Sequence, residues 1–224
     1  MKQPVRICGL GVRVPEETTL EALIALGDCR VVFAALEDAR GLKWLKSRGV
    51  KARRPKGAAE VVAAARRGGP VGLAVWGHPQ FDSALASEVE GLLRAEGLDF
   101  TVYGAISPVG SAFARSVSFL GGDYGYQGAH GAHLETLLSD PDSYSPRLPL
   151  IVYSERAAPA RWEALLALLR ARLPSGHEVR VYPAGSDGET RVALGRLAAK
   201  SLSGAVLLVP PAAGAPKRPH DVAG

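Results

Sequence analysis

The fold is indicated first by the stretch Val71-Gly72-Leu73-Ala74-Val75-Trp76-Gly77-His78-Pro79. Its first six residues are nearly all apolar, which is typical of a strand buried on both faces, and the strand pattern ends abruptly at Gly77. The same pattern occurs at residues 5–8, before the turn Gly9-Leu10-Gly11, and again at residues 30–36. Near-continuous apolar strands that alternate with helices predict a parallel sheet.

Helical spacing fills the segments between these strands. Thr18 and Thr19 are both suitable N-caps, and beyond them apolar residues recur at helical spacing as far as Leu26. Further elements are expected as helices at residues 60–67 and 83–96, a strand at 100–103, and a helix after the turn Gly104-Ala105-Ile106-Ser107-Pro108. The first half therefore alternates strand and helix four times, which predicts an open, doubly wound sheet.

A change in composition near Gly121 divides the chain. Residues 121–145 are rich in Gly, His, Asp and Tyr, and we interpret them as a linker with one short helix at 131–138. A second α/β unit is expected beyond it, as strand 150–153, helix 159–173, strand 178–182, helix 189–199 and strand 205–209. The predicted organisation is an N-terminal α/β domain with Gly-rich loops at 1–120, the linker at 121–145, a C-terminal α/β domain at 146–210 and a mobile tail at 211–224.

Composition limits the class of protein. The chain has 224 residues, of which 47% are hydrophobic and 22% charged, as in ordinary globular proteins. Its two cysteines, Cys8 and Cys29, exclude a disulfide framework and a four-cysteine zinc site, and they predict buried thiols in a reducing compartment. No apolar run approaches the roughly 20 residues of a membrane span, and the N-terminus has no signal-peptide pattern. We therefore expect a soluble, cytoplasmic protein with no membrane partner.

The charge balance bears on the other partners. The formal net charge of +5 is mild for a nucleic-acid-binding protein, aromatic residues are only 6%, and no zinc-finger or RRM signature is present. We expect no nucleic-acid partner, whereas a small anionic substrate is compatible with the excess of positive charge. His130 and His133 have no neighbouring Cys or clear acid partner, so we interpret them as linker residues and predict no metal site.

Three glycine-containing turns follow apolar strands in the first half. They are Gly9-Leu10-Gly11, Gly77-His78-Pro79 and Gly104-Ala105-Ile106-Ser107. In open α/β sheets ligands bind outside the carboxyl ends of strands, and glycine there lets main-chain N–H and C=O groups approach a ligand closely. The three turns together predict a cleft for a small molecule.

A dinucleotide is one candidate ligand. Gly9-x-Gly11 follows a strand, and Glu37-Asp38 stand after the second strand, where an acid that binds ribose would lie. The third glycine of the dinucleotide fingerprint is replaced by Val14, and the helix begins only near Thr18. This pattern disfavours NAD(P), because the third glycine allows the close packing of helix on strand.

A second candidate comes from the motifs taken in order. Gly9-Leu10-Gly11, followed by Thr19-Leu20-Glu21-Ala22-Leu23, then Trp76-Gly77-His78-Pro79-Gln80-Phe81 and Gly104-Ala105-Ile106-Ser107, resemble the tetrapyrrole methylase family of methyltransferases that use S-adenosylmethionine (SAM). The second half resembles the smaller domain of that family, with Leu150-Ile151-Val152-Tyr153 at its start. The resemblance extends to about Pro210.

The resemblance implies two α/β domains of tetrapyrrole methylase type, with SAM in a cleft between them, in a homodimer. It implies methyl transfer to a tetrapyrrole or another small-molecule acceptor. The residues that match the family at its cofactor-binding motifs are Gly9, Leu10, Gly11, Gly77, His78, Pro79, Phe81, Ala105, Ile106, Ser107 and Tyr153.

The chain departs from the family pattern at several positions, and these departures leave alternatives open. Arg13-Val14-Pro15 stand where the first loop usually has Gly-Asp-Pro, His78 replaces the aspartate of the second loop, and Pro108 replaces a frequent Ser or Thr. Gly-His-Pro followed by Phe81 is similar to the borosin-type branch, which methylates peptide-backbone nitrogens. A methylase-like binding module without catalysis is a further alternative. The motifs assign no catalytic residue.

Overall fold

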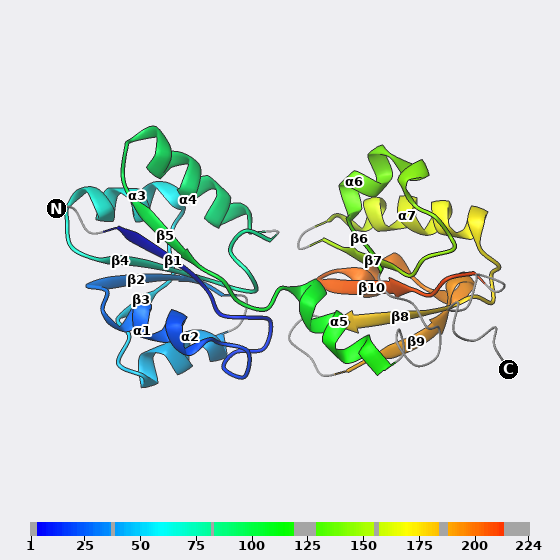
Figure 1. Cartoon of the computed structure of the whole chain (residues 1–224), viewed down its shortest axis with the longest axis horizontal. Helices are drawn as coiled ribbons and strands as arrows, with labels where there is room; N and C mark the ends of the chain where they lie inside the picture. Colours follow the sequence, from blue (N-terminus) through cyan, green and yellow to red (C-terminus); the bar gives the residue numbers. More distant parts are fainter. Residues whose placement is uncertain are drawn as a thin grey trace, which may run out of the picture. The chain divides into compact units, whose positions relative to one another are not determined.

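The computed structural model describes residues 4–36, 39–81, 83–118, 129–154, 157–183 and 188–212. The chain forms two compact units, Met1–Pro108 and Val109–Gly224 (Figure 1). Each unit has its own five-stranded sheet and its own hydrophobic core. The boundary therefore falls before the one expected at residue 120.

The sheet of the first unit is parallel throughout, as predicted. Its strands lie in the order β3-β2-β4-β1-β5, with the bounds β1 Val5–Gly9, β2 Val31–Ala35, β3 Ala52–Arg53, β4 Val71–Val75 and β5 Phe100–Tyr103. The central strand β4 is buried along its whole length, which explains its unbroken apolar sequence. Parallel pairing brings the carboxyl ends of β4, β1 and β5 side by side.

Helices cover both faces of this sheet (Figure 1). One face carries α1 Leu20–Gly27 and α2 Ala39–Ser47, and the other carries α3 Ala58–Arg66 and α4 Ala84–Ala95. Two of the helices begin at a side-chain cap. The hydroxyl of Thr19 accepts a hydrogen bond from the N–H of Ala22 at 3.2 Å, and the hydroxyl of Ser83 accepts one from the N–H of Ala86 at 3.4 Å. The doubly wound arrangement expected for the first half is confirmed.

The Thr19 cap gives a first testable expectation. Replacement of Thr19 by alanine removes the acceptor from the first turn of α1 and should lower the free energy of unfolding by about 1 kcal/mol. Urea unfolding followed by circular dichroism measures the change. Thr19→Ser keeps the hydroxyl and should unfold close to the wild-type midpoint. Equal losses in both variants would show that the hydrogen bond is not the cause.

The second unit has a mixed sheet in the order β6-β7-β10-β8-β9. The bounds are β6 His130–His133, β7 Leu150–Tyr153, β8 Glu178–Pro183, β9 Thr190–Ala193 and β10 Ala205–Val209. The β6–β7 pair is parallel and the other pairs are antiparallel. The helices α6 Leu134–Ser139 and α7 Pro159–Arg172 cover one face, and α5 Pro108–Ser118 covers the other (Figure 1). Short 3-10 turns complete the unit, as η2 Pro141–Ser143, η3 Leu194–Arg196 and η4 Ala199–Leu202.

Two sequence expectations for this unit are wrong. The helix expected at 189–199 is instead β9 followed by a 3-10 turn, because residues 190–193 pair antiparallel with β8. The helix expected at 131–138 begins only at Leu134, because residues 130–133 form β6 against β7. The described part of the expected linker, residues 129–145, therefore belongs to the second unit. Residues 121–128 and 213–224 lie outside the described residues.

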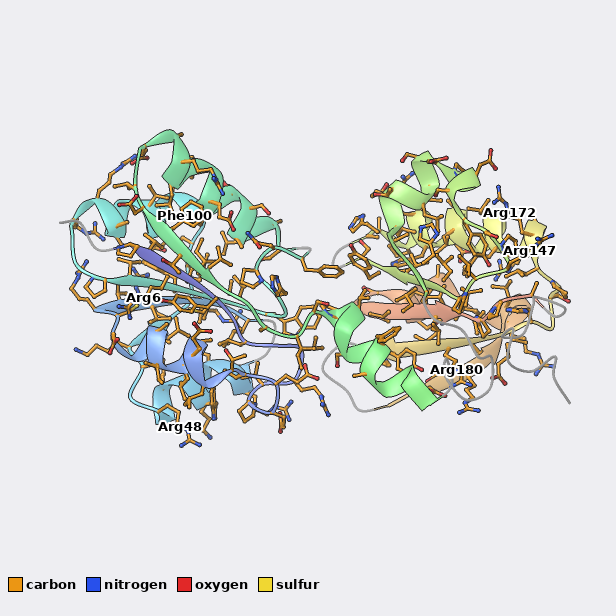
Figure 2. All side chains as sticks on the ribbon, viewed as in Figure 1. Arg6, Arg48, Phe100, Arg147, Arg172 and Arg180 are labelled. Carbon is orange, nitrogen blue, oxygen red and sulfur yellow. The ribbon has the colours of Figure 1, made fainter. Side chains whose placement is uncertain are left out.

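An ionic cluster joins β8 to β9. Arg180 of β8 (Figure 2) is 5% exposed, and its Nη1 lies 3.5 Å from a carboxylate oxygen of Glu189. The same carboxylate accepts hydrogen bonds from the hydroxyl of Tyr182 at 2.8 Å and from Arg191 at 2.5 Å. Burial raises the pKa of Tyr182 to about 12, so the hydroxyl remains a donor at neutral pH. These contacts favour the strand at 190–193 over the helix that the sequence suggested.

No helix in the described part of the chain combines the length and the apolar character needed to cross a bilayer.

Candidate functional site

The three glycine-containing turns of the first unit meet at one point. A methyl group at Gly9 would lie 2.5 Å from the carbonyl oxygen of Gly77, 2.8 Å from Cδ of Pro79 and 2.8 Å from Cβ of Ala105. These atoms follow β1, β4 and β5, whose carboxyl ends share one edge of the sheet. The structure thus brings together the three motifs that the sequence predicted as a site.

The turns after β1 and β4 are joined by their main chains. The N–H of Gly77 donates to the carbonyl of Gly11 at 2.9 Å, and the N–H of Gly11 donates back at 3.3 Å. Both glycines have positive φ, +78° at Gly11 and +67° at Gly77, which disfavours other residues at these positions. The N–H of Leu10 donates to the carbonyl of Val75 at 3.0 Å. The first two turns therefore form one rigid unit.

A buried carboxylate organises the first loop. Glu17 is 7% exposed, and its Oε2 accepts hydrogen bonds from the N–H groups of Val12 at 2.8 Å and Arg13 at 3.1 Å. Its Oε1 accepts from Nε of Arg13 at 2.9 Å. A methyl group at Gly11 would lie only 2.5 Å from Cβ of Glu17. Sequence reasoning missed this residue, although Arg13 and Glu17 stand four positions apart.

The main chain of the first loop is closed by its own contacts. Besides the bonds of Leu10, Gly11 and Glu17, the hydroxyl of Thr18 donates to the carbonyl of Leu10 at 2.8 Å, and Nε1 of Trp76 donates to that of Val12 at 3.0 Å. Each N–H and each C=O of residues 10–13 therefore has a protein partner. This loop forms a wall of the site. The sequence argument expected its N–H groups to be open to a ligand, but the protein itself occupies them.

The second loop presents a histidine. Nδ1 of His78 accepts a hydrogen bond from the N–H of Gln80 at 3.2 Å, so the neutral ring carries its proton on Nε2. That nitrogen lies 3.0 Å from the place that a Cβ would take on Gly104, at the end of β5. The ring therefore extends from the loop after β4 to the loop after β5. The N–H of Phe81 closes a turn on the carbonyl of His78 at 3.0 Å.

The third loop remains open at its main chain. Within the described parts of the chain, the N–H groups of Gly104, Ala105 and Ile106 donate no hydrogen bond. Ile106 is 43% exposed, and Ser107 directly precedes α5. Nε2 of His78 lies against Gly104 of the same loop, so this side of the site offers hydrogen-bond donors.

Tyr153 belongs to the other unit. It is the last residue of β7, and its ring meets that of His133 edge to face, with 5.4 Å between centroids and 82° between planes. His133 ends β6, the parallel neighbour of β7, and its Nδ1 accepts a hydrogen bond from the N–H of Glu135 at 3.2 Å. Tyr153 therefore lies in the second unit, whereas the other predicted site residues lie in the three loops of the first unit.

The two cysteines do not supply a nucleophile. Cys8 and Cys29 are buried free thiols, and burial raises the pKa of Cys8 to about 12 and that of Cys29 to about 11. Since the thiolate is the reactive form, both are inert at neutral pH. The described residues contain no group of three or more His, Cys, Asp or Glu side chains that could hold a metal ion.

Comparisons with known proteins agree with this architecture. Residues 5–199 match the model of the family Tetrapyrrole (Corrin/Porphyrin) Methylases. No curated protein matches the sequence significantly.

Among solved structures, the chain is similar to three methyltransferases. It matches the methyltransferase CobJ with a TM-score of 0.70 at 18% identity, covering 94% of this chain and 95% of that one. It matches uroporphyrin-III C-methyltransferase from Thermus thermophilus with a TM-score of 0.66 at 22% identity, covering 93% and 94%. It matches cobalt precorrin-4 methyltransferase CbiF with a TM-score of 0.64 at 18% identity, covering 92% and 94%. At these identities the likeness is one of fold.

Proposed function

The chain belongs to the tetrapyrrole methylase family, and from this premise we propose that it transfers a methyl group from SAM to a tetrapyrrole or another small-molecule acceptor. The observation that carries the proposal is the meeting of Gly9, Gly77 and Ala105 at one point. Ligands of open α/β sheets bind at such an edge of the sheet. Without the meeting of these three turns, the family match would support the fold but not a binding site at this edge of the sheet.

The residues at this edge suit the cofactor. The lack of a side chain at Gly9 keeps the three turns in contact, and His78 with the N–H groups of residues 104–106 offers donors to the acceptor atoms of an adenosyl amino acid. The proposed site residues are Gly9, Leu10, Gly11, Gly77, His78, Pro79, Phe81, Ala105, Ile106 and Ser107, with Leu10 and Gly11 as parts of the wall. Tyr153 stays a candidate on the family resemblance.

The proposed reaction depends mainly on how the protein positions the cofactor and the acceptor. Bound SAM would supply a methyl group that is activated by its bond to a positively charged sulfur. On transfer the acceptor forms a bond to the methyl carbon and releases a proton, and the sulfur leaves as the neutral thioether of S-adenosylhomocysteine. The rigid turns at Gly11 and Gly77 fix the geometry of the site. Orientation of two reactants can lower such a barrier by roughly 7–11 kcal/mol.

A second candidate function is a binding module without methyl transfer. It is favoured by the first loop, where Glu17 occupies the N–H groups of Val12 and Arg13, and by His78 in place of the usual aspartate. The peptide-nitrogen acceptor gains no support from the family match or from the three named structures.

Isothermal titration with S-adenosylhomocysteine (SAH) tests the proposal. We expect saturable binding with a Kd of roughly 1 μM to 1 mM, the range usual for enzyme substrates. NADH, titrated in parallel, is the ligand control and should give no saturable heat. No heat with SAH at millimolar concentration would contradict the proposal.

Methyl transfer separates the two candidate functions. The protein is incubated with SAM that carries a labelled methyl group and with a tetrapyrrole acceptor such as uroporphyrinogen III. Label in the acceptor eliminates the binding module. SAH binding without transfer to any acceptor tried would favour it.

A further inference from the structure

His78 reverses the hydrogen-bonding character of the second loop. The family resemblance expects an aspartate at this position, and a carboxylate can only accept hydrogen bonds. His78 instead uses Nδ1 as an acceptor for the N–H of Gln80 at 3.2 Å, which leaves Nε2 as a donor. Among the described residues, Nε2 has no hydrogen-bond partner, and it lies against Gly104 at the end of β5. The substitution therefore replaces an acceptor by a donor.

The loop that Nε2 contacts at Gly104 supplies further donors. The N–H groups of Gly104, Ala105 and Ile106 are unpaired within the described residues. In the loop after β4, the carbonyl of Gly77 accepts a hydrogen bond from Gly11, and the carbonyl of His78 accepts one from Phe81. The loop after β5, residues 104–107, contains no Asp or Glu in its sequence, and the loop after β4, residues 76–83, contains one acid, Asp82. A ligand group that meets Nε2 of His78 must therefore bring an acceptor atom.

We propose that His78 donates a hydrogen bond from Nε2 to a carboxylate of the ligand bound at the carboxyl ends of β4 and β5. This inference rests on the proposed function, because it takes that edge as the binding site. Two sources could supply the carboxylate, namely the amino-acid end of the cofactor or an acid group of a tetrapyrrole substrate. A carboxylate is the acceptor that gains most from such a donor, since charge-assisted hydrogen bonds are the stronger ones.

The test is a series of variants at one position, titrated calorimetrically. His78→Asp restores the usual family residue, but it places a carboxylate of the protein next to the carboxylate of the ligand. It should therefore weaken the binding of that ligand by about 10-fold or more. His78→Leu removes the donor and should also weaken the binding of the carboxylate ligand. His78→Gln keeps an N–H and should retain most of the affinity. The matched control is Gln80→Asp, which adds the same charge two residues away on an exposed side chain.

Three ligands distinguish the two sources. SAH carries the amino-acid carboxylate, 5′-methylthioadenosine shares its nucleoside but lacks that group, and uroporphyrin III is a tetrapyrrole with several carboxylates. Loss of SAH affinity with unchanged methylthioadenosine affinity assigns the contact to the cofactor. Loss confined to uroporphyrin III assigns it to the acceptor.

Other outcomes overturn the inference. Tighter SAH binding by His78→Asp would show that residue 78 has to accept a hydrogen bond from the ligand. Equal losses for SAH and methylthioadenosine would show a general effect on the loop, and unchanged binding of SAH and uroporphyrin III in His78→Leu would show no contact. Failure of the wild-type protein to bind SAH at all would instead contradict the proposed function itself.

Discussion

Gly9→Ala is expected to lower the free energy of unfolding by about 1–3 kcal/mol, the usual cost of overpacking. It should also weaken SAH binding by about 10-fold or more, because displacing the loops by even 1 Å disturbs a positioned site. The added methyl group would lie 2.5 Å from the carbonyl oxygen of Gly77, and it would also press on Pro79 and Ala105. The Gly77 carbonyl cannot yield easily, since it is bound to Gly11. Urea unfolding and isothermal titration measure the two effects.

Gly91→Ala is the matched control for this variant. Gly91 lies on the exposed side of α4, and apart from its chain neighbours and the backbone of its own helix no atom lies within 4 Å of the place that its Cβ would take. Because alanine is the better helix former, the control should be more stable than the wild type by up to about 1 kcal/mol. A Gly9→Ala protein as stable as Gly91→Ala would contradict the packing of the three turns described above.

Glu17→Ala is expected to cost about 2–4 kcal/mol of unfolding free energy, the range for removing one partner from a buried hydrogen-bonded charge pair. It deprives the N–H groups of Val12 and Arg13 and the guanidinium of Arg13 of their acceptor. The side chain of Arg13 is one-third exposed, so water recovers part of the loss. The midpoint of urea unfolding should therefore fall clearly.

The neighbouring residue supplies the control for Glu17. Glu16 is exposed, and Glu16→Ala should change the stability by no more than about 0.5 kcal/mol. Glu17→Gln keeps one oxygen for the N–H groups and should fall between the two alanine variants. Equal stability of Glu16→Ala and Glu17→Ala would refute the organising role of the Glu17 carboxylate.

The sequence predicts the elements whose pattern of apolar residues matches the faces that are buried in the fold. The strands at Leu150–Tyr153 and Ala205–Val209 were expected at their observed bounds, because both faces are covered and every residue is apolar or nearly so. The helix α7 was expected with Trp162, Leu165, Leu166 and Leu169 inside, and all four are buried. Where local pattern and tertiary burial agree, a single sequence suffices.

The misses share a different cause. Residues 190–193 become a strand because they pair with β8, whose Arg180 and Tyr182 also contact the carboxylate of Glu189, and these partners come from the tertiary fold. Residues 130–133 pair with β7, which lies about twenty positions further along the chain. Glu17 reaches the N–H groups of Val12 and Arg13 only because Gly11 turns the chain at φ +78°. No spacing rule in the sequence encodes such contacts.

The closed first loop has a practical consequence for engineering. Residues 11–18 behave as a cassette, since Gly11, Glu17 and Thr18 satisfy the main chain of the loop from within or from the adjoining strands. A graft of the usual family loop would therefore have to replace the whole cassette at once. Libraries that aim to alter ligand choice should leave the cassette intact and randomise positions 78 and 104–107.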